Sequence, residues 1–517
     1  MFKALIARSK CVAIIFVMIA MVFTTAPSQA QSPQQELETM FQGTMEALSR
    51  HATEMDMSLI TEGDLLVEDS GKYFAVTLPH LKVRAESGHY ADIGIVAINV
   101  MPGQDADQWK MTLAIPSPIL IYNERDTPYI SVNINQQNFA GVWSNKIRYF
   151  TMINANYRDI TVTNLSKSGG LTIPALSMIV DMKEQPNGRW SGPADLRISG
   201  LDLSDGADMT LRIEDILMTS SMGDYSFEDA LVYIEQIEAL NESITADGTV
   251  STSPENILAF YNLFIDYFGK TFDSADFDIQ VKNMVAQRVD KQGNPETFKL
   301  GDLSYGVSLS GLLKNELNLG FSFGFADFAM EPNPTDLGPV SEITPDKFVF
   351  DISFNKLPFK ELADLGRSSI QDISTNPAMG NMVGLNAAMM LPQLLTQSGA
   401  NITLDEVLLA NEMYKLAQSG VFTTDLAAQF GFVGNVRTSF HGLDKVIAFL
   451  NENAANPALS PEQRKRVSDA IMALSMLQMM GQSETDSNGP YRLYDFVLQK
   501  DGQMLMNGTD VRSMIPQ

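Results

Sequence analysis

Residues 484–495 carry oxygen-donating side chains at a spacing that could bind calcium. Glu484, Asp486 and Asn488 occupy positions one, three and five of a twelve-residue loop, a glycine follows at position six, and Asp495 occupies position twelve. EF-hand loops place their oxygen ligands at these positions, but with Asp at the first and the longer Glu at the last. These four residues are therefore a candidate metal site, while an acidic turn is the favoured interpretation.

Acid–base and nucleophilic catalysis has few candidate residues in this chain. The four histidines form no His-Glu-x-x-His or His-x-His pair. We find no nucleophile turn between a strand and a helix, and the glycines of residues 320–325 alternate with aromatic residues, as in a strand. We therefore expect a non-catalytic protein with no catalytic residue and no cofactor. A carboxylate-based hydrolase is the less favoured alternative, because the distance between two acids cannot be read from sequence.

Four aromatic residues are candidates for lining a ligand-binding face. Tyr73, Trp109, Trp143 and Trp190 lie in or beside segments with the alternation of strands. Aromatic side chains combine a large apolar area with a polar edge, which suits them to apolar or amphipathic ligands. Ordinary packing in a core or an interface is the alternative for each of them.

Composition limits the partners of the chain. Its 517 residues include 36 Lys and Arg and 62 Asp and Glu, for a net charge of −26. Nucleic acids and anionic membranes are both bound through basic surfaces, so we expect no nucleic-acid partner, and membrane contact only through an uncleaved signal segment. The one cysteine is Cys11, which leaves residues 31–517 without a thiol and excludes a disulfide-stapled fold.

The first thirty residues have the pattern of a signal peptide. Positive charges in the first ten residues precede an apolar run over residues 11–23, and Ser28-Gln29-Ala30 forms a small-x-small cleavage site. We expect export to the periplasm and cleavage before Gln31. The alternative is an anchor in the inner membrane formed by residues 11–26.

Helix start signals recur along the chain. Ser-Pro pairs at Ser32, Ser253 and Ser460 supply an N-cap followed by proline at the first helical position, and each precedes a helical apolar stripe. A capping box at 403–406 predicts a further helix. The predicted helices cover residues 32–57, 226–240, 254–268, 379–392, 443–450 and 461–479, with one more beginning at 403.

Between residues 64 and 220 the apolar period changes to two, which is typical of strands. Turn sequences separate long strands at short spacing, and without helices between them such strands pair in an antiparallel manner. The predicted strands cover 73–85, 91–100, 109–122, 128–136, 147–163, 171–183, 189–203 and 208–220, and later 276–289, 297–310, 315–330, 347–357 and 491–507.

Prolines interrupt several of these strands, at Pro79, at Pro116 and Pro118, and at Pro174. Proline cannot donate to a sheet ladder, so it is confined to edges, bends or bulges. This favours a long, bent open sheet with a concave face, which helices could either fill or leave open to a ligand. We predict an α+β protein in which residues 31–225 form a helix and a long curved antiparallel sheet, and residues 226–517 mix helices with strands and end in a β-hairpin.

The C-terminal segment, residues 498–508, reads LQKDGQMLMNG, a strand, an Asp-Gly turn and a second strand. It resembles the closing hairpin of YdgA-like exported proteobacterial proteins of unknown function, which also have an N-terminal export segment, long alternating strands and little cysteine. The resemblance implies a Gram-negative envelope protein with extended sheets, and no catalytic residue.

The favoured function is therefore the binding of an apolar or amphipathic ligand, of which lipid is one example, or of an envelope partner, on a concave sheet face. A structural or assembly protein of the envelope without any ligand is the alternative. A lined cavity would distinguish the two.

Overall fold

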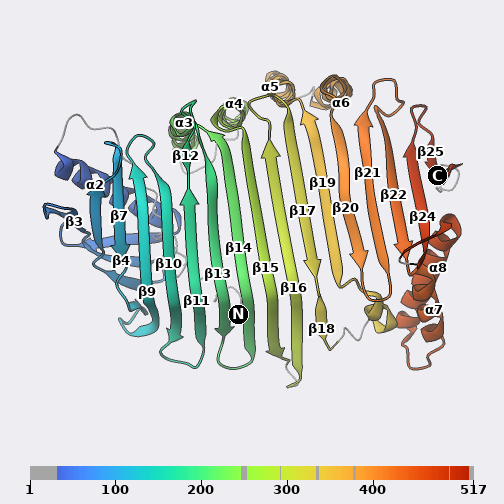
Figure 1. The fold of residues 1–517 in the computed structure, drawn as a ribbon, viewed down its shortest axis with the longest axis horizontal. Coiled ribbons are helices and arrows are strands. Elements are labelled where there is room, and N and C mark those ends of the chain that lie inside the picture. The colour runs from blue at the N-terminus through green and yellow to red at the C-terminus, as the bar shows by residue number, and fades with distance from the viewer. Residues whose placement is uncertain are drawn as a thin grey trace. The chain divides into compact units, whose positions relative to one another are not determined.

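The computed structural model describes residues 32–245, 253–290, 293–332, 337–376, 380–487 and 489–511. Strand pairing joins 26 strands into a large antiparallel sheet accompanied by helices (Figure 1). The predicted α+β class with a long antiparallel sheet is confirmed. The predicted signal peptide lies outside the described residues. Within the described ranges, no helix is both long enough and apolar enough to span a bilayer.

The chain divides into two compact units. The first contains the residues up to Lys183 together with 192–218 and 286–293, and the second contains 184–191, 219–285 and 294–517. The predicted domains divide the chain once, at 225–226, whereas the units exchange short segments. Four described strands contain residues of both units: β12 (Lys183–Glu184), β13 (Trp190–Ser204), β14 (Met209–Tyr225) and β15 (Ser274–Val289).

The first unit begins with α2, whose N-cap Ser32 and Gln35 form the expected capping box. Leu37 and Phe41 of this helix are fully buried, and the helix packs against β1 and β2. The elements of the unit are α2 (Pro33–Glu54), β1 (Met57–Glu62), β2 (Leu66–Asp69), β3 (Phe74–Thr77), β4 (His80–Ala85), β5 (Tyr90–Gly94), β6 (Ala97–Pro102), β7 (Gln108–Ala114), β8 (Ile119–Tyr122), β9 (Pro128–Ser144), β10 (Tyr149–Asn164) and β11 (Gly170–Asp181).

Three predicted long strands of this unit are each two shorter strands with different neighbours. The segment 73–85 is β3 and β4, and β3 pairs with β2 and β6 whereas β4 pairs with β1 and β5. The segment 109–122 is β7 and β8, separated by residues 115–118, and both pair with β9. The segment 91–100 divides in the same way into β5 and β6. Pro79, Pro116 and Pro118 therefore mark points where the chain passes between two branches of the sheet that meet at β9, because proline cannot continue a ladder.

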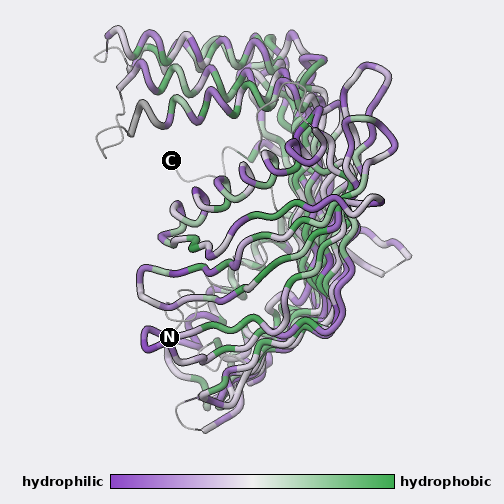
Figure 2. The backbone as a smooth tube through the Cα atoms, turned by 90° about the vertical axis from the view of Figure 1, so that its left-hand side faces the viewer, coloured by the Kyte–Doolittle hydropathy of each residue, from purple (hydrophilic) through white to green (hydrophobic). Residues whose placement is uncertain are grey.

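Pro174 has a different role, because β11 continues through it. The pairing with β10 skips this residue, joining Ile173 to Ile160 and Ala175 to Arg158. Its neighbours have left-handed backbone conformations, with φ of 52° at Asp159 of β10 and 74° at Gly200 of β13. A Cβ on Gly200 would lie 3.1 Å from Cγ of Pro174. Three adjacent strands thus bend at the same level, and Figure 2 shows strands that curve along their length.

The second unit continues the antiparallel pattern. Its elements are α3 (Phe227–Thr245), α4 (Pro254–Thr271), β16 (Pro295–Ser310), β17 (Leu317–Ala326), β18 (Ala329–Glu331), η1 (Gly338–Ile343), β19 (Lys347–Leu357), α5 (Phe359–Thr375), α6 (Gly380–Ser398), β20 (Asn401–Ala410), β21 (Lys415–Thr424), β22 (Phe432–His441), α7 (Leu443–Ala454), α8 (Pro461–Met480), β23 (Gln482–Asp486), β24 (Gly489–Leu498), β25 (Met504–Met506) and β26 (Thr509–Asp510).

Four helices of this unit, α3 to α6, lie side by side in a row at one end of its strands (Figure 1). Arg367 of α5 donates through Nε to Oδ1 of Asn262 on α4 at 2.7 Å, and Tyr261 of α4 donates to the carbonyl of Ala363 at 3.2 Å. These bonds hold the two middle helices of the row together. The helices therefore pack mainly on one another.

The structure corrects two helix predictions in this unit. The capping box at 403–406 does not open a helix, because these residues lie in β20, where Thr403 and Leu404 pair with Ser353 and Ile352 of β19. Here pairing with neighbouring strands outweighs the local capping signal. The predicted end of a helix at Pro392 is also wrong, since α6 continues through this proline to Ser398.

Candidate functional site: an open apolar sheet face

Strands β16, β17, β19, β20 and β21 of the second unit present one apolar face. Directly paired residues of antiparallel strands point to the same side, and alternate residues point to opposite sides. Phe323 is paired with Tyr305 on one neighbour and with Phe350 on the other, and Phe350 is paired with Val407. We call the resulting surface the apolar face. It consists of Leu303, Tyr305, Val307, Leu309, Leu319, Phe321, Phe323, Phe325, Phe348, Phe350, Ile352, Phe354, Ile402, Leu404, Val407, Leu409, Leu416 and Phe422.

The apolar face is half-exposed along its whole width. Tyr305, Phe321 and Phe323 retain 43%, 38% and 39% of their accessible surface, and every other member is only partly buried. The aromatic rings contact one another across strands. The ring centroids of Phe323 and Phe348 are 5.9 Å apart, and those of Phe325 and Phe348 are 5.8 Å apart with the rings nearly parallel.

No second layer covers the middle of the apolar face in the described part of the chain. The sustained contacts of β17, β19 and β20 are with neighbouring strands, apart from contact between α6 and β19. Two clusters of buried side chains lie instead around α7 and α8, one built on Leu450 and Val467 and one on Phe440 and Tyr494. A contiguous exposed apolar surface of this kind is typical of a binding site.

The opposite face of the same strands is largely polar. It presents Ser304, Ser308 and Ser322 on β16 and β17 and Asp351 and Ser353 on β19. Burial raises the pKa of Asp351 above its usual value, and the nearby Asp405 and Glu406 raise it further. The sheet is therefore amphipathic, and this separation of faces makes the apolar face a distinct surface.

The tryptophans expected to line a ligand face belong to the core instead. Trp109 and Trp143 are opposite each other on β7 and β9 and retain 6% and 0% of their surface. Nε1 of Trp109 donates to Oε1 of Glu36 on α2 at 3.3 Å, and Nε1 of Trp143 donates to Oδ1 of Asn145 at 2.9 Å. Both rings are thus held by packing and hydrogen bonds inside the first unit and do not line an open face.

Trp190 and Tyr73 also lie away from the apolar face. Trp190 is 6% exposed and packs edge-on against Phe227, with ring centroids 6.0 Å apart. Tyr73 is 38% exposed in the turn that precedes β3 in the first unit. None of the four predicted lining residues contributes to the surface that the strands leave open.

The three candidate calcium ligands that the structure describes, Glu484, Asp486 and Asp495, lie on strands. Glu484 accepts a hydrogen bond from the hydroxyl of Tyr491 at 2.7 Å, and Asp486 lies 3.1 Å from Nε2 of His441. Asp495 is paired with Arg437, four positions further along β24 than the partner of Glu484. Asn488 lies outside the described residues. Among the residues that are described, no group of three or more acidic or histidine side chains is placed to hold a metal.

Ser322 stands in a Gly-x-Ser-x-Gly sequence but has no catalytic setting. It lies in the middle of β17, paired with Gly306 and Asp351, and not at a turn between a strand and a helix. The four histidines are dispersed: His51 contacts Glu54, His80 contacts Asp92 at 2.6 Å, His89 contacts Ser87, and His441 contacts Asp486. The arrangement matches no nucleophile–base pair of the known kinds.

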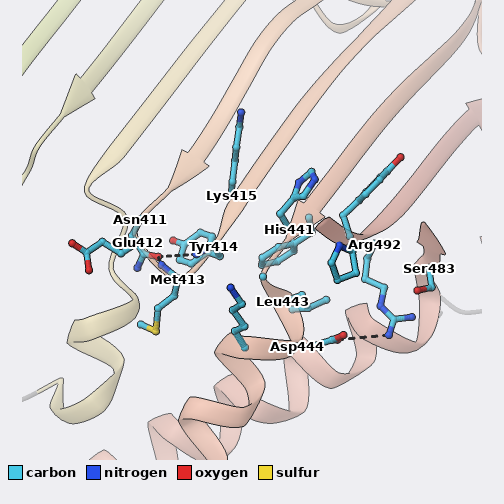
Figure 3. Close-up of a pocket in the computed structure, with 15 residues that line it drawn as sticks. Asn411, Glu412, Met413, Tyr414, Lys415, His441, Leu443, Asp444, Ser483 and Arg492 are labelled. Atoms are coloured by element: carbon cyan, nitrogen blue, oxygen red, sulfur yellow. Dashed lines mark hydrogen bonds and ion pairs between the residues drawn. The ribbon is translucent and has the colours of Figure 1, made fainter. Parts of the chain in front are cut away.

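A pocket of about 280 Å³ lies in the second unit where β21 begins and β22 ends (Figure 3). Tyr414 and Phe440 form part of its wall, and their rings are 5.8 Å apart. Burial raises the pKa of the Tyr414 hydroxyl, and Asp346 raises it further. Figure 3 shows Lys415 and His441 extending from neighbouring strands and Arg492 reaching toward Asp444 at the start of α7.

The residues of the apolar face were missed because sequence does not tell whether an alternating face is covered. A signal was present, since aromatic residues alternate with Ser and Gly over 319–325 and again over 348–354. No protein-family model, curated protein or solved structure matches the chain. The resemblance to YdgA-like proteins therefore stays a prediction, and the function must be inferred from the site itself.

Proposed function

We propose that the protein is an exported, non-catalytic binding protein whose apolar face holds an apolar or amphipathic ligand. The observation that carries the proposal is the half-exposed aromatic surface of β16 to β21, which no described layer covers. Keeping the apolar side chains of this face in water costs a free energy of roughly 25 cal/mol for each Å² of apolar surface. A ligand that covers it removes this cost, and acyl chains have the flexible apolar shape that fits an extended sheet face.

The polar side of the same strands supports a ligand on one side only. Ser304 is exposed and Ser322 and Ser353 are partly exposed, and their hydroxyl groups tolerate water without a second layer. The net charge of −26 keeps such a protein soluble while it exposes apolar surface. These properties suit a carrier of apolar molecules better than a structural element.

Native mass spectrometry of the mature protein, combined with organic extraction, tests the proposal. We expect a co-purifying apolar adduct, and we expect purified protein to bind oleyl alcohol. A clean mass together with no binding of oleyl alcohol would overturn the proposal and favour a structural or partner-binding role.

A pair of matched charge insertions locates the binding surface. Phe323→Asp places a carboxylate in the centre of the apolar face, and Ser419→Asp places one on the polar side opposite Arg437. We expect Phe323→Asp to reduce binding of oleyl alcohol at least about tenfold, because a desolvated charge costs several kcal/mol. Ser419→Asp should bind as the unchanged protein does. Equal binding by both variants, with both folded by circular dichroism, would place the ligand elsewhere.

A further inference from the structure

A hollow of about 440 Å³ lies on the polar side of β20, β21 and β22. We propose that this hollow binds a neutral polyhydroxylated molecule, such as an oligosaccharide. The site is separate from the apolar face, because Ala417 and Ser439 of the hollow are paired with each other and alternate with Leu416 and Phe440, which point to the other side. A volume of this size is typical of small-molecule sites.

Small side chains form the floor of the hollow. Ser419 of β21 and Ser439 of β22 lie between higher walls that come from the neighbouring strands. Asp405 and Glu406 form one wall, at the point where the pairing of β20 with β21 shifts its register. The hydroxyl of Ser353 on β19 donates to Oδ2 of Asp405 at 2.6 Å, which fixes the position of that carboxylate.

Two stacked rings form the opposite wall. His441 of β22 is paired with Tyr491 of β24, and their ring centroids are 4.8 Å apart with 23° between the ring planes. Nε2 of His441 lies 3.1 Å from Oδ2 of Asp486, and the hydroxyl of Tyr491 donates to Glu484 at 2.7 Å. These contacts hold both rings before a ligand binds, which lowers the entropy cost of binding. A sugar ring packs its C–H groups against aromatic surfaces of this kind.

The polar groups of the hollow select the class of ligand. Arg437 only donates hydrogen bonds, whereas the carboxylates of Asp405, Glu406 and Asp486 only accept them. An anion would be repelled by the three carboxylates. An amine has donors only, so it would be repelled by Arg437 and would leave that side chain without an acceptor. A sugar hydroxyl both donates and accepts, so a neutral sugar is able to pair with all of these groups.

Binding of neutral trisaccharides tests the proposal. We expect maltotriose, cellotriose or chitotriose to bind the unchanged protein in saturation-transfer NMR and isothermal titration calorimetry. Ser439→Phe fills the floor of the hollow and should weaken this binding at least about tenfold. The matched control Ser308→Phe, on the polar side of β16 and outside the hollow, should bind normally. Both variants should bind oleyl alcohol as the unchanged protein does, because its proposed site is on the other side of the sheet.

Glu406→Ala provides a second variant, at an exposed position. It removes one acceptor and should weaken trisaccharide binding about fivefold, the effect of one hydrogen bond. Melting temperatures verify that the variants are folded.

Three results would overturn the assignment of the hollow. These are failure of all three trisaccharides to bind, unchanged binding by the folded variants, and binding of spermidine more tightly than any trisaccharide, which would identify a cation site. None of them affects the proposal for the apolar face, which the binding of oleyl alcohol tests separately.

Discussion

Both units are built from strands with alternating apolar residues, but they differ in how deeply these residues are buried. In the first unit, alternating strands and α2 enclose their apolar side chains, and Leu81, Ile119 and Trp143 are completely buried. In the second unit, strands with equally apolar faces leave Tyr305 and Phe323 about two-fifths exposed. The difference does not come from the strands, since both sets alternate. It comes from whether a second layer is present.

This contrast distinguishes apolar residues that are buried in a core from apolar residues that remain exposed on a sheet face. The sheet of the first unit divides at its prolines into two branches that meet at β9, and α2 packs against β1 and β2. In the second unit, β16, β17, β19 and β20 pair one after another. The half-exposed residues of the apolar face are therefore functional candidates, whereas Trp143 is a core residue.

Truncation of one aromatic residue in each unit should give the largest difference. We expect Trp143→Ala to reduce the free energy of unfolding of the first unit by about 3–5 kcal/mol, because it leaves a cavity in a closed core. Phe323→Ala should cost the second unit only about 1–2 kcal/mol, since its ring is already partly in water. Hydrogen-exchange mass spectrometry measures both, because its peptides report the units separately. Similar losses in the two units would remove the contrast between a closed core and an open face.

Tyr157 offers a smaller test inside the closed core. Its side chain is 1% exposed, its hydroxyl has no hydrogen-bond partner in the described part of the structure, and burial raises its pKa to about 12. We expect Tyr157→Phe to stabilise the first unit by about 1 kcal/mol, because a buried hydroxyl without a partner is costly. A loss of stability on this substitution would show that the hydroxyl has a partner.

The same tyrosine predicts a pH dependence. Its pKa in the folded protein is above the value in the unfolded chain, which is about 10. Ionisation of Tyr157 therefore leaves the stability unchanged below about pH 10 and lowers it as the pH rises from about 10 toward 12. Alkaline titration followed by circular dichroism should show the first unit losing stability in this range, and Tyr157→Phe should reduce that loss.

Asp351 predicts the smallest effect, on the polar side of the second unit. Because its folded pKa is raised, its ionisation destabilises the folded state as the pH rises through that pKa. We expect Asp351→Asn to add about 0.2–1 kcal/mol at pH 7, by removing a like charge opposite Glu406, and nothing at acid pH, where the carboxyl is protonated. Asp495→Asn is the matched control, because Asp495 is opposite Arg437 and should give no gain. Thermal melts at both pH values measure the difference.

The sequence predicted those elements that carry their own signals. Ser32, Ser253 and Ser460 are the N-caps of α2, α4 and α8, because Ser-Pro pairs act within one helical turn. The helix α5 was missed, since its N-cap is Pro358 and no side chain caps it. The segment at 403–406 misled because a local capping pattern says nothing of the strand that lies beside it.

The candidate site depended on information that lies between strands. Alternation in 319–325 and 348–354 predicts two strands but not that Phe323 and Phe350 share a face, which depends on register. Nor could the sequence show that Trp143 is enclosed while Phe323 is open, because both have the same local pattern. A choice of ligand-lining residues by aromatic type alone therefore picked Trp143, which is the more buried of the two.

The succession of strands in the second unit also sets the width of the apolar face. From β16 through β17, β19, β20, β21 and β22 to β24, each strand pairs with the next one in this succession, so its contacts are made with near neighbours in sequence. Proteins built in this way gain or lose units without rebuilding the rest. One additional hairpin would widen the apolar face by roughly 10 Å. The number of hairpins therefore sets the width of the apolar face, and duplication or deletion of one would change the length of the ligand that we propose for this face.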